Sequence, residues 1–198
     1  METSSPERII TYVEQFIKLS EQDKNAVTEK FKPIKVKKRQ FIVQPGFVAR
    51  NRYFVIKGAL KGYVIGDEGQ EHTIQLALED WWISDYNSYI FQQPATMFVM
   101  ALEDCTLLQI KYEDEQFLKN SSHRLETFFR IIAERAAAFM QRRIIINLTQ
   151  SAEERYDSFM QRYPLMLQRI PQYAIASYLG MTTEFLSKIR NKKVRRKR

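Results

Sequence analysis

The residues with the most evident chemistry are the bases near the C-terminal end of the chain. Ten of its 31 Lys and Arg residues lie between residue 162 and the end, a segment whose single acid is Glu184. The other 161 residues carry 21 bases and 22 acids, so they are close to neutral. Positive charge confined to one segment is typical of a surface that binds a polyanion. The alternative interpretation is a solvated basic tail that favours solubility.

The basic segment also contains the pattern of two short helices joined by a tight turn. Pro171 suits the first position of a helix, Gly180 suits the left-handed residue at which that helix ends, and Thr182 suits the cap of the next helix. Ala176 is small where the two helices would cross. The apolar seam between them consists of Ile175, Leu179, Leu186 and Ile189. Together these features indicate a helix-turn-helix.

In a helix-turn-helix, the second helix enters the major groove of double-stranded DNA, where its N-terminal side chains reach the base edges. Here that helix would run from Thr182 to about Lys192. Glu184 would accept a hydrogen bond from cytosine, and Lys188 would donate one to guanine. The bases that follow, including those at 195–198, would contact phosphates. The predicted DNA-binding residues are Thr182, Thr183, Glu184, Ser187, Lys188, Arg190, Lys192 and Lys193.

Upstream of this segment, the apolar pattern predicts two short leading helices and then a set of strands. Apolar residues at helical spacing occupy the first thirty residues, and Pro33 interrupts them. At least six short runs rich in β-branched and aromatic residues follow in fewer than eighty residues. Runs this close together leave no room for crossover helices, so the sheets should be antiparallel. The predicted fold class is α+β, with an N-terminal antiparallel β-roll of the double-stranded β-helix (jelly-roll) type and flanking helices.

A long helix is predicted from about Ser121 to Leu148, because no Pro or Gly interrupts its apolar pattern. At 1.5 Å per residue, such a helix measures about 40 Å. It carries apolar residues on two sides, so it needs two partners. The roll would cover one side and a second copy of the chain the other, by coiled-coil packing; the alternative is a helix buried wholly within one chain. The predicted dimer interface consists of Leu125, Phe129, Ile132, Ala136, Phe139 and Ile146.

A further helix is predicted from Ser151 to Arg162, since Ser151 and Glu154 have the spacing of a capping box and Pro164 would end the helix. The expected organisation is therefore a sensor domain at 1–120, a dimerisation helix at 121–148, and a helix-turn-helix domain with a basic tail at 149–198.

In this order of parts, the chain resembles the Crp/Fnr family of bacterial transcription regulators over nearly its whole length. The likeness is carried by Pro45-Gly46, by the runs RYFVIKGALKGY and WWISDYNSYIFQQPATMF, by the long helix, and by the motif IASYLGMTTEFLSKIR. The closing motif is similar to the short members common in Bacteroidetes bacteria. The resemblance implies a cyclic-nucleotide-binding-type roll, a homodimer along the long helix, and DNA-binding domains that an effector repositions. It implies double-stranded DNA and an unidentified small-molecule effector as partners, with RNA polymerase as a further candidate.

Two departures from the family pattern bear on function. The family follows its recognition helix with a β-wing, whereas the few residues left here, all polar or basic except Val194, predict that a wing is lacking. In the phosphate-binding cassette, Ser84-Asp85 stands where cyclic-nucleotide-binding members have Gly-Glu, and Ala95-Thr96 where they have Arg and then Ser or Thr. Ala95 supplies no cation, so the effector is not expected to be cyclic AMP. The predicted effector pocket consists of Asp85, Tyr86, Ser88, Thr96 and, as a base arriving from the long helix, Arg135.

Catalytic and metal-binding chemistry is poorly represented. Cys105 is the single cysteine, and the two histidines, His72 and His123, stand at no metal-ligand spacing, so neither a metal site nor a cofactor is expected. No catalytic triad or Gly-rich phosphate loop occurs, so no enzymatic activity is expected.

No apolar run is long enough to span a bilayer and the N-terminus lacks the order of a signal peptide, which predicts a cytoplasmic protein with no membrane partner. An RNA-binding protein would be expected to show aromatic stacking positions among its bases, and after Phe185 there are none. The remaining alternative is a dimeric small-molecule sensor that acts through protein partners and whose basic tail binds nucleic acid non-specifically.

Overall fold

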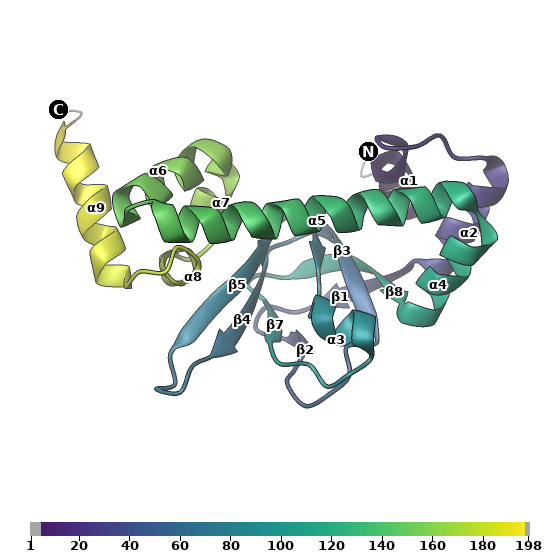
Figure 1. Cartoon of the computed structure of the whole chain (residues 1–198), viewed down its shortest axis with the longest axis horizontal. Helices are drawn as coiled ribbons and strands as arrows, with labels where there is room; N and C mark the ends of the chain where they lie inside the picture. The colour runs from purple at the N-terminus through teal and green to yellow at the C-terminus, as the bar shows by residue number, and fades with distance from the viewer. Residues whose placement is uncertain (1–4, 197–198) are drawn as a thin grey trace.

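The computed structural model describes the backbone of residues 5–196 and the side chains of residues 6–193. Two leading helices are followed by a β-roll, a long helix that runs along the molecule, and a C-terminal group of helices (Figure 1). The helices are α1 (Ser5–Glu14), α2 (Glu21–Lys30), α3 (Tyr86–Phe91), α4 (Tyr112–Ser121), α5 (His123–Thr149), α6 (Ala152–Arg162), α7 (Pro164–Arg169), α8 (Gln172–Tyr178) and α9 (Thr183–Arg196). The strands are β1 (Lys32–Val36), β2 (Phe41–Val43), β3 (Asn51–Lys57), β4 (Leu60–Ile65), β5 (Glu71–Ala77), β6 (Trp82–Ile83), β7 (Phe98–Ala101) and β8 (Cys105–Lys111).

The strands form two four-stranded sheets, in the order β1-β8-β3-β6 and β2-β7-β4-β5, and every neighbouring pair is antiparallel. The antiparallel roll predicted from the sequence is confirmed. The sequence pattern does not predict β1, β6 or α3. Strand β6 has only two residues, too few to show a period, and β1 contains Pro33. Proline is tolerated there because β1 lies at the edge of its sheet.

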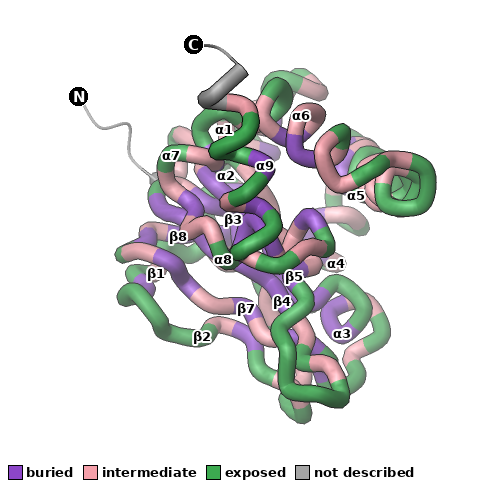
Figure 2. Tube along the Cα trace, turned by 90° about the vertical axis from the view of Figure 1, so that its left-hand side faces the viewer, coloured by how far each residue is buried: buried purple, intermediate pink, exposed green. Residues whose placement is uncertain are grey.

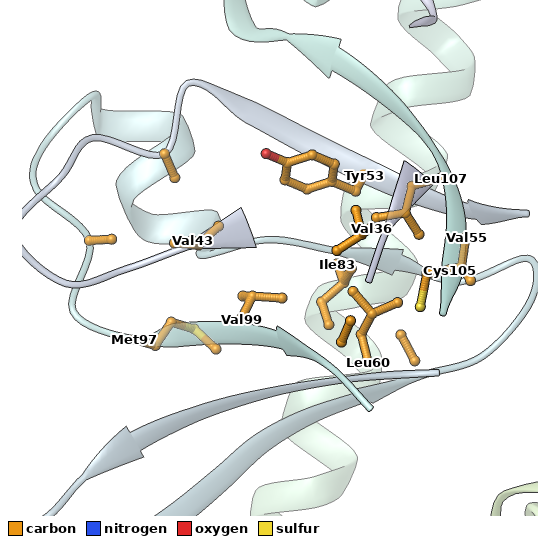
Figure 3. Packing of buried hydrophobic residues seen from close by; sticks show 14 residues of the cluster. Val36, Val43, Tyr53, Val55, Leu60, Ile83, Met97, Val99, Cys105 and Leu107 are labelled. Carbon is orange, nitrogen blue, oxygen red and sulfur yellow. The ribbon is translucent and has the colours of Figure 1, made fainter. Parts of the chain in front are cut away.

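The space between the two sheets holds the core of the roll (Figure 3). Leu60 and Val99 from one sheet face Leu107 from the other, and all three are fully buried. Cys105 is buried in the same core, where a free cysteine packs like a small apolar side chain. Gly58 has a φ of +119°, and a Cβ at this position would lie 2.4 Å from Cys105 Sγ. The turn between β3 and β4 therefore requires glycine for both its conformation and its packing.

Helix α5 lies across the roll, and its first half packs into the core of its own chain (Figure 1). Leu125, Phe129 and Ile132 are only 1%, 3% and 7% exposed. The other members of this core come from α1, α2, β3, β8 and α4 and include Ile9, Val13, Val27, Phe54, Leu108 and Leu118. The prediction that these three side chains of α5 form the dimer interface is therefore wrong. The apolar repeat indicates that α5 has two apolar sides, but it does not tell which side the roll covers.

The C-terminal helical unit, residues 152–196, packs against the second sheet and shares an apolar cluster with it. Helix α8 lies along β5, the edge strand of that sheet. The Thr73 amide donates to Ser177 Oγ (2.8 Å), and this hydroxyl donates to the Glu71 carbonyl (2.7 Å). Arg143 of α5 donates to the carbonyls of Thr73 (2.8 Å) and Tyr178 (3.3 Å). These hydrogen bonds tie β5, α5 and α8 together.

Most buried residues of the roll lie in its strands, whereas many residues of α5 that face away from the roll are exposed (Figure 2). Within residues 5–196, no helix combines the length and the apolar content that are needed to cross a bilayer.

Candidate DNA-reading surface and roll cavity

Helices α8 and α9 form the predicted helix-turn-helix. Gly180 has a φ of +67°, the left-handed conformation expected where the first helix ends. Thr182 caps the second helix, and its Oγ1 accepts a hydrogen bond from the Phe185 amide at 3.1 Å. Pro171 is the residue before the first helical position and not the first position itself. Ala176 is 1% exposed. The predicted seam is also buried, and its members are Ile175, Leu179, Leu186 and Ile189.

Helix α9 presents a polar surface on the side away from α8. Glu184 and Lys188 are exposed and stand four residues apart, so they lie on one face of the helix. Ser187 turns toward α8 instead, and its Oγ accepts a hydrogen bond from Gln172 Nε2 at 2.5 Å. Phe185, which is 45% exposed beside Glu184, is not among the DNA-binding residues predicted from the sequence. The sequence pattern does indicate that Phe185 is exposed, because Leu186 and Ile189 form the buried seam and residue 185 lies on another side of the helix.

The bases of α9 differ in their partners. Lys192 and Lys193 form ion pairs with carboxylates of α6. Arg190 donates to Gln172 Oε1 of α8 at 3.1 Å. Exposed ion pairs contribute about 0–1 kcal/mol, so a phosphate group can compete for these side chains. The side chains at 194–198, which include the predicted phosphate contacts of the basic tail, lie outside the described residues.

A cavity of about 500 Å³ lies between the roll and α5. Its polar lining residues are Arg52, Gln75, Ser84, Asp85, Tyr86, Asn87 and Thr96. Its apolar lining residues are Val64, Ile74, Trp82, Ile83, Met97, Ile132, Ala133, Ala136, Ala137 and Met140. Three of the five residues predicted for the effector pocket, Asp85, Tyr86 and Thr96, therefore line one cavity.

The other two predicted pocket residues do not line this cavity. Ser88 is fully buried inside α3, where its Oγ accepts from the Ala49 amide at 2.9 Å and donates to the Gln93 carbonyl. The guanidinium of Arg135 lies 5.1 Å from the centre of the Phe16 ring, in a cation–π contact. Phe16 belongs to the segment that follows α1. The placement of Ser88 and Arg135 in the pocket is therefore wrong, because local backbone partners hold the first and an aromatic ring holds the second.

Asp85 is 2% exposed and already engages the donors that a bound anion would use. Its Oδ1 accepts from the Ser88 amide at 3.0 Å, which caps α3. Its Oδ2 accepts from the amides of Thr96 at 2.8 Å and Met97 at 3.3 Å, with the Thr96 hydroxyl at 3.5 Å. The Asp85 carboxylate thus occupies the backbone N–H groups of the cassette as an acceptor that the protein itself supplies.

The cavity does have a cation, Arg52, which is not among the residues predicted from the sequence because it comes from β3 and lies outside both the cassette and α5. Arg52 comes from β3, is 4% exposed, and its Nε lies 2.6 Å from Glu115 Oε2. Its guanidinium lies 4.4 Å from the ring of Trp82. The same fully buried Glu115 accepts from Tyr89 Oη (2.9 Å) and pairs with Lys119 Nζ (2.5 Å). Burial raises the pKa of Tyr89, so this phenol stays a neutral donor.

Comparison with known proteins agrees with this geometry. The family model of the cyclic nucleotide-binding domain matches residues 33–121. Among solved structures, FixK2 from Bradyrhizobium japonicum is similar with a TM-score of 0.71 and 14% identity, covering 82% of this chain and 83% of that chain. The c-di-GMP-responsive global regulator CLP of Xanthomonas campestris has a TM-score of 0.66 and 15% identity, covering 87% of this chain and 91% of that chain.

The catabolite activator protein of Thermus thermophilus has a TM-score of 0.56 and 17% identity, covering 90% of this chain and 85% of that chain. The search of curated proteins finds no match. The likeness to the short Bacteroidetes members stays a prediction. Residues 33–121 are therefore similar to the cyclic nucleotide-binding domain, and the chain as a whole shares its fold with FixK2, CLP and the catabolite activator protein.

Proposed function

We propose that the protein is a dimeric, sequence-specific DNA-binding transcription regulator of Crp/Fnr type, and not an enzyme. The observation that carries this proposal is α9, a capped helix held on one side by a buried seam and exposing Glu184, Phe185 and Lys188 on the other. This arrangement is what a recognition helix needs to bring side chains to base edges in the major groove.

Within this proposal, the base-reading residues are Thr183, Glu184, Phe185 and Lys188. Phe185 is added because an exposed aromatic ring can contact the methyl group of thymine. Ser187 is a further base-reading residue, whose hydroxyl also accepts a hydrogen bond from Gln172 of α8. The positioning residues contact phosphates and are Thr182, Arg190, Lys192 and Lys193.

The proposed dimer uses the second half of α5, where the roll leaves an apolar surface uncovered. Ile144, Ile145 and Leu148 are 57%, 52% and 80% exposed, and Ala137 lies one heptad before Ile144. Water-exposed aliphatic residues at this spacing are typical of a coiled-coil seam. Of the interface residues predicted from the sequence, Ala136 is exposed, whereas Phe139 and Ile146 are half-buried and can only flank the seam. A two-fold pair of α5 helices would present two copies of α9 to one palindromic site.

The proposal is tested by selecting preferred duplexes from a random library and measuring affinities by fluorescence anisotropy. Glu184→Ala and Lys188→Ala are each expected to lose about 1–3 kcal/mol of discrimination at one base pair per half-site. Lys192→Ala together with Lys193→Ala should weaken binding to all sequences alike and lower the slope of log K against log salt, by about 0.9 per lost phosphate contact. If Glu184→Ala and Lys188→Ala selected the same duplexes as the unaltered protein, α9 would not be the reading helix.

We propose further that the effector in the roll cavity is an uncharged, mostly apolar molecule and not cyclic AMP. The charged residues of the described lining, Arg52 and Asp85, have opposite signs, and Arg52 is already paired with Glu115 outside the lining. Four buried side-chain atoms of the described lining residues have no hydrogen-bond partner: Arg52 Nε and Nη2, Trp82 Nε1 and Gln75 Oε1. Arg52 Nε is ion-paired with Glu115, so an apolar ligand with two acceptors and one donor would satisfy the other three atoms.

Calorimetric titration of the purified protein with cyclic AMP and with adenosine tests the effector proposal. A cyclic phosphate would have to enter beside the Asp85 carboxylate, with the loss of affinity that an unmatched buried charge brings. We expect cyclic AMP to bind no more tightly than neutral adenosine, with any dissociation constant in the millimolar range or weaker. Micromolar binding of cyclic AMP with a clear preference over adenosine would contradict the proposal.

A further inference from the structure

A second cavity, of about 470 Å³, lies between the C-terminal half of α5, helix α6 and the end of α8, and it shares no lining residue with the roll cavity. Figure 1 shows these helices meeting at one end of the molecule. The cationic lining residues are Arg142, Arg143, Arg155 and Arg162. The aromatic lining residues are Phe139, Phe159, Tyr163 and Tyr178. No Asp or Glu is among the described residues that line it.

The two inner arginines are held by backbone carbonyl groups. Arg143 donates to carbonyls of β5 and α8, and its guanidinium lies 4.2 Å from the ring of Tyr178. Its Nε is buried without a hydrogen-bond partner, and burial lowers the pKa of this guanidinium. Arg155 donates to the carbonyls of Leu179 (2.9 Å) and Gln150 (2.8 Å). Both groups are therefore oriented by the fold before any ligand arrives.

The charge of this cluster is not compensated by a carboxylate of the described residues. None of the four arginines forms an ion pair with another described residue, although Arg124, Arg130 and Arg169 elsewhere in the chain do. Arg142 and Arg162 are exposed at the rim of the cavity. Four like charges around one cavity, two of them desolvated in part, favour an anion that enters it.

We propose that this cavity binds a small aromatic anion, a planar ring that carries a phosphate or a carboxylate group. Guanidinium groups pair with both acids through two parallel hydrogen bonds. The aromatic walls would stack against the ring, and the volume is in the range of about 300–1,000 Å³ that is typical of small-molecule sites. A duplex does not fit a cavity of this size, and the face of α9 that carries Glu184 and Lys188 does not line it. A ligand here would join α5, α6 and α8 at the point where the helix-turn-helix meets the long helix.

Calorimetric titration of the full-length protein tests the proposal with 1-naphthyl phosphate and 2-naphthoate, two aromatic anions that distinguish a phosphate from a carboxylate. 1-Naphthol supplies the ring without the charge, and inorganic phosphate supplies the charge without the ring. At least one aromatic anion should bind saturably below millimolar concentration, and both controls should bind at least tenfold more weakly. Arg142→Gln combined with Arg162→Gln should weaken that binding at least tenfold. Arg124→Gln combined with Arg130→Gln, on the same helix but outside the cavity, should leave it unchanged.

The proposal is overturned if neither aromatic anion binds, if 1-naphthol binds equally well, or if the Arg142 and Arg162 pair can be removed without effect. A further outcome also overturns the proposal: the unaltered protein binds no aromatic anion, and the variant that combines Arg142→Gln with Arg162→Gln loses affinity for DNA. The two arginines would then be DNA contacts. Because α9 is unchanged in these variants, base preference remains a separate readout of the proposed DNA-binding function.

Discussion

Replacing Ile144 and Leu148 by Glu is expected to convert the protein into folded monomers that bind their DNA site at least roughly a hundredfold more weakly. The two side chains are largely exposed on the uncovered side of α5, so Glu introduces no buried charge into the monomer. In the proposed dimer the four new carboxylates would face one another across the seam and prevent association. Loss of the second reading head removes the avidity of linked sites, which is on the order of 10²–10⁴.

Sedimentation velocity at micromolar concentration measures the change in mass, and fluorescence anisotropy measures the change in affinity. Phe47→Glu is the matched control, because this side chain is 70% exposed on the roll and far from α5 in the sequence. It should leave both the mass and the affinity unaltered. An unaltered protein that sediments as a monomer, or a double variant that remains dimeric, would rule out this interface. Ile132→Glu would not serve as a test, since residue 132 is 7% exposed and the change would disrupt the core.

Replacing Asp85 by Ala is expected to lower the free energy of unfolding by about 3–5 kcal/mol, because several buried donors lose their acceptor and a helix loses its cap. The substitution leaves the amides of Ser88, Thr96 and Met97 without their acceptor. Each buried unsatisfied donor costs about 1–3 kcal/mol. It also removes the cap of α3, whose loss typically costs about 1 kcal/mol. For a chain of this length, the midpoint of thermal unfolding should fall by roughly 10 °C.

Thermal and urea unfolding followed by circular dichroism measure this loss. Asp85→Asn should recover part of the stability, since an amide oxygen still accepts hydrogen bonds but carries no charge. Asp67→Ala, in the exposed hairpin between β4 and β5, is the matched control and should stay within about 0.5 kcal/mol. If Asp85→Ala were as stable as the unaltered protein, the cassette amides would not depend on this carboxylate. These amides would then be free to bind a cyclic phosphate, contrary to the effector proposal.

The helix-turn-helix shows how much of a site can be predicted from the sequence. Gly180 and Thr182 act on the backbone within a few residues of themselves, through a left-handed conformation and a cap, so their roles are readable without tertiary contacts. The same holds for the capping box of Ser151 and Glu154, which is present at the start of α6 as predicted. The antiparallel roll is likewise predicted, because short runs of β-branched and aromatic residues that follow one another closely leave no room for crossover helices.

The partners of polar side chains were decided only by the tertiary structure. Asp85 is a plausible ligand-binding residue in the sequence, yet the fold turns its carboxylate onto the amides of Thr96 and Met97. Arg52 and Glu115 lie far apart in the chain and meet only because β3 and α4 pack together around one buried cluster. The sequence also leaves undetermined which apolar face of α5 packs on the roll. A period of 3.6 residues specifies the position and width of an apolar face but not the element that covers it. Contacts of this kind, such as that of Thr73 with Ser177 across 104 residues, depend on packing between elements that the local sequence does not encode.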